Sequence, residues 1–143
     1  MNRNEMKLEF DSISANEAFA RVTVAAFMAQ MNPSMEEVAD VKTAVSEAVT
    51  NAIIHGYKGE IHKITILGVI EDRQLRLEIV DQGVGIADVK KAMEPLYTSR
   101  PELERSGMGF LFMEAFMDEV EVVSHLGEGT TIVMKKQIGQ HGA

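Results

Sequence analysis

The sequence predicts an α+β protein, a two-layer sandwich in which a mixed, mostly antiparallel sheet carries helices on one face. Some segments alternate apolar and polar residues as strands do, whereas others repeat apolar residues at the helical period. Their order is strand, helix, helix, strand, strand, long loop, helix, strand, strand. With 143 residues, 45% of them hydrophobic, we expect residues 1–143 to form a single domain.

The first half of the chain contains one predicted strand and two predicted helices. Residues 6–11 alternate apolar and polar side chains, which is typical of a strand. Each helix begins with the serine-to-glutamate spacing of a capping box. The two pairs are Ser14 with Glu17 and Ser34 with Glu37. Pro33 ends the first helix, and Gly56 is expected to cap the end of the second.

The second half contains two predicted hairpins and one helix. Strands are expected at 63–72, 74–81, 119–125 and within 126–137, and a helix at 107–117. Residues 86–107 are charged and contain two prolines, with only a brief helical stretch at 87–93, so we expect a lid. The tail from residue 138 is expected to fray.

Composition and charge exclude several classes of protein. The net charge of −8 argues against direct binding of nucleic acid, which needs a basic surface. The chain has no cysteine, so disulfides and thiolate metal sites are excluded. Its start lacks the apolar core of a signal peptide, and no apolar run approaches the roughly 20 residues of a membrane span. We therefore expect a soluble, cytoplasmic protein that does not bind a membrane.

A polar stripe runs along the second predicted helix. Glu47, Asn51 and His55 are spaced four residues apart, so they share one face. This stripe borders the main apolar face, formed by Val41, Val45, Ala48 and Ala52. Because burying a polar group is costly unless it is paired, the stripe indicates a ligand or a polar network.

The second motif, Asp81 to Gly85 (DQGVG), directly follows a predicted strand. Gly83 and Gly85 lack a Cβ and allow the backbone to approach a flat ligand. The Asp81 carboxylate would accept a hydrogen bond from the amino group of adenine, whereas guanine presents a carbonyl at that place. An ordinary turn with aspartate as turn former is the alternative.

The third motif, Ser106 to Phe110 (SGMGF), lies at the exit of the predicted lid and the start of the predicted helix of residues 107–117. Free N–H groups and the helix dipole attract an anion there, which suits a triphosphate. A bound triphosphate would need Mg²⁺, for which Asn51 offers an amide oxygen, and Glu47 would act as a base near the γ-phosphate. The alternatives are a buried amide bonded to backbone for Asn51 and a helix-dipole or packing role for His55.

The order of these motifs resembles the N, G1 and G2 boxes of the GHKL ATP-binding superfamily, which includes gyrase, Hsp90, histidine kinases and MutL and has the Bergerat fold. The resemblance covers about residues 40–133. The small size and the segments 19–57 and 81–88 are similar to the anti-sigma serine kinases of Gram-positive bacteria.

That resemblance implies an anti-sigma factor that inhibits a sporulation sigma factor and uses ATP and Mg²⁺ to phosphorylate a serine of an anti-anti-sigma protein. It implies Glu47 as general base, Asn51 as magnesium ligand and Asp81 as the adenine-recognising residue. The implied nucleotide contacts are Gly83, Gly85, Gly107, Met108 and Gly109, with Thr130 in the adenine hydrogen-bond network and His55 as a further candidate. Related proteins are dimers, so a homodimer is expected.

The predicted lid adds three candidates. Arg105 is either a clamp on the γ-phosphate or a solvated residue, and Thr98 and Ser99 either contact phosphates or cap turns.

Phe110 follows the minimal GMG where histidine kinases usually have a further glycine, and the chain has no helical domain with an acceptor histidine. The acceptor must then come from another chain. An ATP-gated binding module without phosphoryl transfer is the alternative function, and a histidine kinase fragment is a third.

Overall fold

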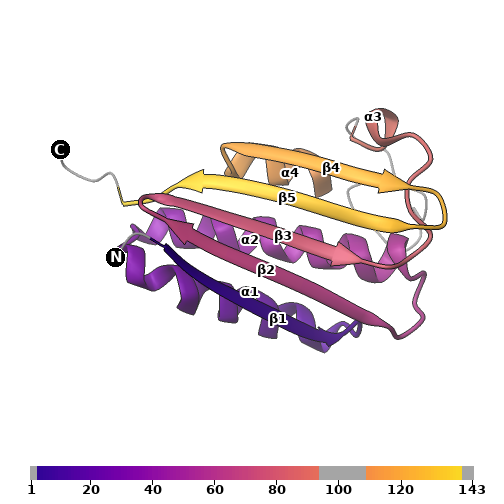
Figure 1. Ribbon diagram of the computed structural model, residues 1–143, viewed down its shortest axis with the longest axis horizontal. Coiled ribbons are helices and arrows are strands. Elements are labelled where there is room, and N and C mark those ends of the chain that lie inside the picture. Colours follow the sequence, from indigo (N-terminus) through magenta and orange to yellow (C-terminus); the bar gives the residue numbers. More distant parts are fainter. Residues whose placement is uncertain (1–2, 94–108, 140–143) are drawn as a thin grey trace.

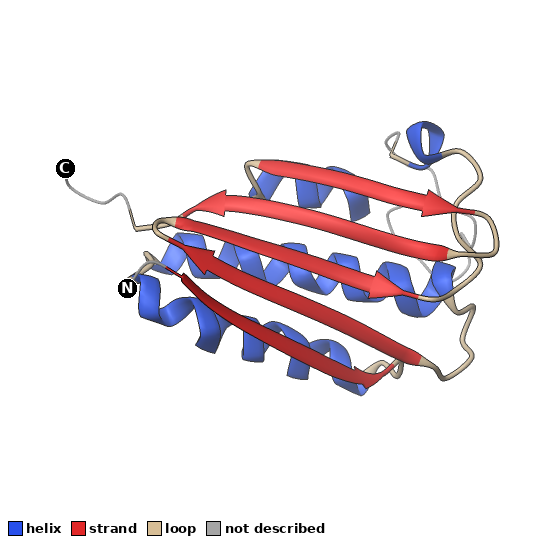
Figure 2. Cartoon of the chain, viewed as in Figure 1, coloured by secondary structure: helices blue, strands red, loops and turns tan. Residues whose placement is uncertain are grey.

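The computed structural model describes residues 3–93 and 109–139, and in these ranges the chain forms a five-stranded sheet with helices behind it (Figures 1 and 2). The strands are β1 (Arg3–Asp11), β2 (Lys63–Glu71), β3 (Gln74–Asp81), β4 (Glu119–His125) and β5 (Gly129–Gln137). The helices are α1 (Ala15–Met28), η1 (Ala29–Met31), α2 (Met35–Asn51), η2 (Ala52–Gly56), α3 (Val89–Ala92) and α4 (Gly109–Phe116). The predicted two-layer α+β class is confirmed.

The strand order is β1-β2-β3-β5-β4, and each of the four pairings is antiparallel. This order inserts the last strand between β3 and β4. The register places Asp81, the last residue of β3, opposite Ile64 on one side and Thr130 on the other. The predicted adenine-recognising carboxylate and the threonine assigned to the same network therefore lie side by side at one end of the sheet.

The hydrophobic core lies between the sheet and α1, α2 and α4. Strands β2 and β3 contribute alternate residues to it, as period-2 sequences require. The predicted apolar face of α2 is buried, from Val41 to Ala52. Each valine removed from water in this way contributes about 1.5–3 kcal/mol to folding. The core thereby fixes the rotation of α2 and places its polar stripe at the edge of the packed face.

The two capping-box predictions have opposite outcomes. Ser34 and Glu37 form the full reciprocal pair, with N–H to side-chain oxygen distances of 2.9 and 3.0 Å. The prediction for Ser14 is wrong, because Ser14 has helical dihedral angles and its side chain makes no capping bond. The Glu17 N–H instead donates to the Ser14 backbone oxygen at 3.1 Å, and the Glu17 carboxylate pairs with Arg21 at 3.3 Å.

Two further boundaries differ from the sequence predictions. Strand β1 begins at Arg3, earlier than residue 6, because it pairs with β2 as far as Glu71. The tail is not frayed at Ile138, which is 1% exposed and donates its N–H to the Arg73 oxygen at 2.8 Å. Helix α3 confirms the brief helix predicted within 87–93, whereas the rest of the predicted lid, from residue 94 to 107, lies outside the described residues.

The Ser34 capping box provides a test of the fold. Ser34→Ala removes the side-chain oxygen that accepts the Glu37 N–H, so we expect a loss of about 1 kcal/mol in the free energy of unfolding. Urea denaturation measures it. Ser14→Ala is the matched control, since the Ser14 side chain makes no capping bond, and a loss there as large as at Ser34 would contradict the assignment.

Candidate functional site

The site is centred on Asp81, whose side chain is only 3% exposed. Its Oδ1 accepts the Gly83 N–H at 2.9 Å, and the backbone of Thr130 also bonds to the carboxylate. Burial raises the pKa of Asp81, while these two backbone bonds act in the opposite direction. Gly56 lies directly against the carboxylate, because a Cβ there would be 2.9 Å from its Oδ1. The fold thus accommodates a carboxylate where its charge is poorly hydrated.

The loop after Asp81 is held between two backbone segments. On one side, the Val84 N–H donates to the Gly56 oxygen at 2.9 Å. On the other, the Gly127 N–H of the β4–β5 turn donates to the Val84 oxygen at 2.7 Å. The loop is therefore anchored to both η2 and the last hairpin.

Gly83 and Gly85 are required by these contacts with the protein's own backbone. A Cβ at Gly83 would lie 2.1 Å from the Gly56 oxygen. Gly85 has φ +78°, and a Cβ there would lie 2.1 Å from the His125 oxygen. The close approach that the sequence predicted toward a ligand is thus seen here as an approach of one backbone segment to another.

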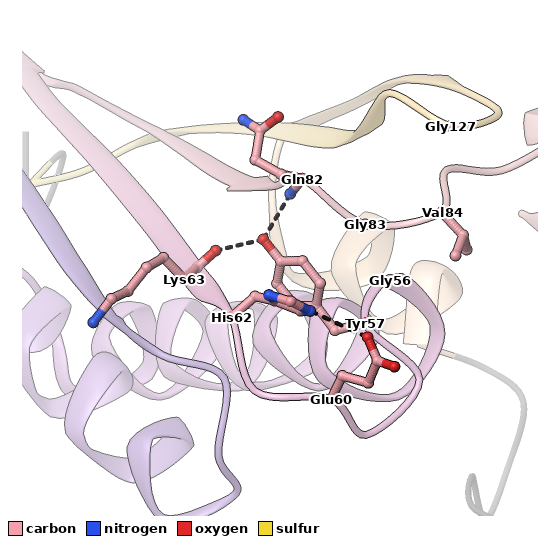
Figure 3. Close-up of a pocket in the computed structure, with 9 residues that line it drawn as sticks. All are labelled: Gly56, Tyr57, Glu60, His62, Lys63, Gln82, Gly83, Val84 and Gly127. Atoms are coloured by element: carbon pink, nitrogen blue, oxygen red, sulfur yellow. Dashed lines mark hydrogen bonds and ion pairs between the residues drawn. The ribbon is translucent and has the colours of Figure 1, made fainter.

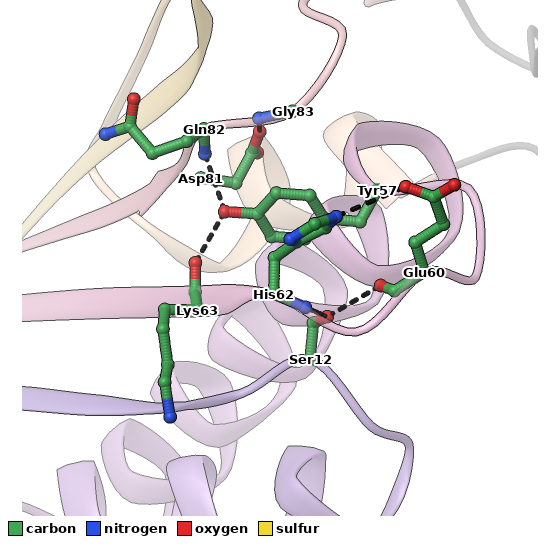
Figure 4. Close-up of polar contacts among 8 residues, drawn as sticks. All are labelled: Ser12, Tyr57, Glu60, His62, Lys63, Asp81, Gln82 and Gly83. Carbon is green, nitrogen blue, oxygen red and sulfur yellow. Dashed lines mark hydrogen bonds and ion pairs between the residues drawn. The ribbon is translucent and has the colours of Figure 1, made fainter.

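Tyr57 holds the ends of two strands together beside this loop (Figure 4). Its hydroxyl donates to the Lys63 oxygen at 2.5 Å and accepts the Gln82 N–H at 2.7 Å. The residue is 6% exposed, and its ring lies 4.9 Å from that of His62. Burial raises the pKa of the Tyr57 phenol, so it keeps its proton at neutral pH. Tyr57 is not among the residues predicted from the sequence, although an aromatic residue directly after Gly56 was the available signal.

A shallow cavity of about 410 Å³ adjoins the loop (Figure 3). Its wall comes from the end of η2 and the segment up to Lys63, from Gln82 to Val84, and from Gly127. Ser12 fixes that segment by donating to the Glu60 oxygen at 3.0 Å and accepting the His62 N–H at 2.9 Å. The cavity is therefore framed by ordered backbone.

The polar stripe of α2 is half-buried, as predicted for Glu47, Asn51 and His55. The α-helix ends at Asn51, however, and continues as the π-helical turn η2 through Gly56. Gly56 is therefore the last residue of this turn, and its predicted C-cap role is wrong. A glycine is needed there because a side chain would collide with Asp81. Single π turns are uncommon in proteins and are frequent at functional sites.

The structure brings together one part of the predicted site. Asp81, Gly83, Gly85 and Thr130 meet at one end of the sheet beside Gly56, the last residue of the turn that carries His55. Gly109 begins α4. Five predicted residues lie outside the described residues: Thr98, Ser99, Arg105, Gly107 and Met108.

The side chains in the described part of the chain that could bind the predicted Mg²⁺ are few. Among residues 3–93 and 109–139, no group of three histidine, aspartate or glutamate side chains is arranged to hold a metal ion. A single amide such as Asn51 still fits Mg²⁺, which retains waters and binds phosphate oxygens. No helix in the same ranges is long and apolar enough to cross a membrane.

Comparison with known proteins defines the class. Residues 12–136 match the family described as histidine kinase-like ATPase domain. The chain is 60% identical to an anti-sigma F factor of Clostridium acetobutylicum, over 96% of each chain. It is 58% identical to an anti-sigma F factor of a Geobacillus strain, over 95% of this chain and 94% of that one.

Two solved structures share the fold. A Mycobacterium tuberculosis protein with RsbU and RsbW domains aligns with a TM-score of 0.66 and 19% identity, covering 94% of this chain and 32% of that one. A histidine kinase domain from Erythrobacter litoralis aligns with a TM-score of 0.55 and 17% identity, covering 87% and 61%. The chain therefore belongs to the histidine kinase-like ATPase family and, within it, to the family of anti-sigma F factors.

Burial of Asp81 predicts a defined pH dependence of stability. Because its folded-state pKa is raised above the ordinary 3.8, the group favours folding most below that value. This contribution is lost as the pH rises through the folded-state pKa. Asp81→Asn does not titrate and lacks that loss, so the unfolding free energy of the nucleotide-free variant, relative to the wild type, should rise as the pH goes from 4 to 7. Urea denaturation at pH 4 to 7 measures this, and a difference between the two proteins that stays constant with pH would contradict it.

The close backbone contact at Gly85 predicts that a side chain there lowers the free energy of unfolding. Gly85→Ala forces a Cβ against the His125 oxygen at a left-handed residue. Gly59→Ala is the matched control, with φ +84° and nothing within 4 Å, and should cost only the left-handed penalty of about 1–2 kcal/mol. We expect a clearly larger loss of unfolding free energy for Gly85→Ala. Equal losses for the two variants would show that the loop moves freely away from the β4–β5 turn.

Proposed function

We propose that this chain is an ATP-dependent serine protein kinase and an anti-sigma factor. In this proposal it binds and inhibits a sporulation sigma factor and transfers the γ-phosphoryl group of ATP to a serine of an anti-anti-sigma protein. Support comes from its membership of an ATPase family and from relatives named anti-sigma F factor. The observation that carries it is the buried Asp81 carboxylate beside Thr130, held by backbone on several sides.

Asp81 suits adenine because its carboxylate is an acceptor in a poorly hydrated place. The 6-amino group of adenine donates to such an acceptor, whereas the 6-carbonyl of guanine would be repelled by it. Thr130 lies opposite Asp81 on β5, and its hydroxyl would bond to the same base. Gly83 and Gly85 would border the base.

The phosphates are assigned to the other end of the site. Gly107, Met108 and Gly109 would offer backbone N–H groups near the start of α4, and Arg105, Thr98 and Ser99 would approach from the lid. Asn51 would hold Mg²⁺, which neutralises phosphate charge when bound. His55, half-buried in η2, remains a candidate nucleotide contact.

Glu47 is assigned to the transfer step. It would take the proton from the acceptor serine hydroxyl as the serine oxygen bonds to the γ-phosphorus and the bond to the β-phosphate oxygen breaks. ADP then leaves. Glu47 is half-buried one turn before Asn51 on α2, so the two residues share one face, which supports this assignment.

We extend the proposal to assembly: residues 1–143 act as one domain, with a lid at 86–107, in a cytoplasmic homodimer. Helix α1 supports the dimer. Val24 and Met28 face the core, whereas Phe19 and Val22 are 50% and 56% exposed. Exposed apolar side chains on one helix are typical of association surfaces.

A single substitution separates the kinase from an ATP-gated binding module. With γ-labelled ATP, magnesium and a candidate anti-anti-sigma protein, Glu47→Gln should lower the transfer rate at least about 100-fold, because it removes the base. Its ATP affinity by calorimetry should stay close to that of the wild type.

Glu36→Gln is the matched control, since Glu36 is an exposed carboxylate on the same helix. Transfer by Glu47→Gln at the wild-type rate would refute the role of Glu47. A wild type that binds ATP and sigma factor without any transfer would favour the binding module. Acid-labile phosphate on the chain itself would instead indicate a histidine kinase fragment.

A further inference from the structure

Ser124 occupies a junction that none of the assigned roles uses. It lies near the end of β4, opposite Thr130 on β5. Its half-buried hydroxyl accepts the Ile86 N–H at 2.7 Å and lies 3.0 Å from the Gly129 oxygen and 2.7 Å from the Thr130 hydroxyl. The Ser124 side chain thus links the loop after Asp81 to Thr130, the residue that pairs with Asp81.

The proton count on these hydroxyls is restrictive. A serine hydroxyl has one proton and two lone pairs, and the Ile86 N–H occupies one lone pair. If Ser124 donates to the Gly129 oxygen, Thr130 must donate to Ser124 and keeps only lone pairs for other partners. If Ser124 donates to Thr130, the Thr130 proton is free for another acceptor. The direction in which the Ser124 hydroxyl donates its proton therefore decides whether the Thr130 hydroxyl can act as a donor or only as an acceptor toward another partner.

The partners of Ser124 also lie next to the Asp81 carboxylate, which is proposed to recognise the base. Thr130 is 3% exposed, and its backbone bonds to Asp81. Ile86, a further partner of Ser124, lies in the loop that begins after Asp81, and this loop also contacts the β4–β5 turn through Gly127. Ser124 is thus bonded to two of the segments that surround the carboxylate, and it contributes no group to the cavity wall.

We infer that Ser124 is a positioning residue for base selection: it orients the Thr130 hydroxyl and holds the loop of residues 82–86 so that a purine with a 6-amino group is preferred over one with a 6-carbonyl. This inference rests on the proposed binding of ATP. Removing the hydroxyl leaves the Ile86 N–H without its acceptor and the Thr130 hydroxyl free to rotate.

The test compares ATP with inosine triphosphate, which replaces the 6-amino group by a carbonyl, using calorimetry on the full chain. Ser124→Ala should weaken ATP binding about 5- to 10-fold, as expected for one lost hydrogen bond, and change inosine triphosphate binding much less. The dissociation constant for inosine triphosphate divided by that for ATP should therefore decrease. Ser124→Thr, which restores a hydroxyl, should recover the ratio.

Two further measurements keep the inference falsifiable. In nucleotide-free protein, amide hydrogen exchange at Ile86 should be faster in Ser124→Ala than in the wild type. Val123→Ala is the control, because Val123 is the preceding residue, 48% exposed, and should change neither quantity. In a double-mutant cycle with Thr130→Val, the effects on ATP affinity should be clearly non-additive.

An unchanged ratio together with a lower melting temperature would reduce Ser124 to a structural role and overturn the inference, as would additivity with Thr130→Val. A wild type that binds neither nucleotide would overturn the proposed function and the base selection together. The two failures are therefore distinguishable, because only the second removes binding from the unmodified chain.

Discussion

The burial of one carboxylate, that of Asp81, is the constraint around which this end of the molecule is built. A buried charge is costly unless hydrogen bonds replace its water. Here the replacement comes from backbone, from the Gly83 N–H and from Thr130. Backbone approaches this closely only where side chains are missing, which explains the glycines at 56 and 83. Gly56 and Gly83 are thus consequences of a single electrostatic requirement, whereas Gly85 meets a separate steric one, a left-handed backbone against the His125 oxygen.

The sheet topology makes that requirement achievable. Strand β3 lies in the middle of the strand order, so Asp81 at its end has paired neighbours on both sides, one on β2 and one on β5. Tyr57 then joins the start of β2 to the residue after Asp81, at the point where the strands separate. An edge strand would leave one side of the carboxylate open to water. The position of Asp81 in the strand order therefore matters as much as its chemistry.

The features that the sequence predicted correctly depend on local periodicity. The apolar face of α2, its half-buried polar stripe and the Ser34 capping box all follow from residues within a few turns of one another. The features that it missed depend on distant partners. Gly56 is required only because the Asp81 carboxylate lies against it, and Ser124 gains importance only when β4 lies beside β5 and the loop that contains Ile86. Ser14 is the exception, since a local backbone bond from Glu17 replaces its capping role. No spacing rule brings together positions 86, 124 and 130.

The acidic composition also limits how a polyanion such as ATP can be bound in the proposed function. A net charge of −8 gives no long-range attraction, although salt screens it beyond about 8 Å. In the proposed function, binding would then rely on short-range groups: backbone N–H donors near the start of α4, a metal ion at Asn51 and the arginine at 105. A base site of fixed hydrogen bonds would complement this arrangement, because it would recognise the neutral part of the nucleotide. In this proposal the phosphate contacts would supply the affinity common to all purine triphosphates, and the base site would add affinity only for a 6-amino purine. A change at Ser124 would therefore lower the added affinity without altering the phosphate contacts.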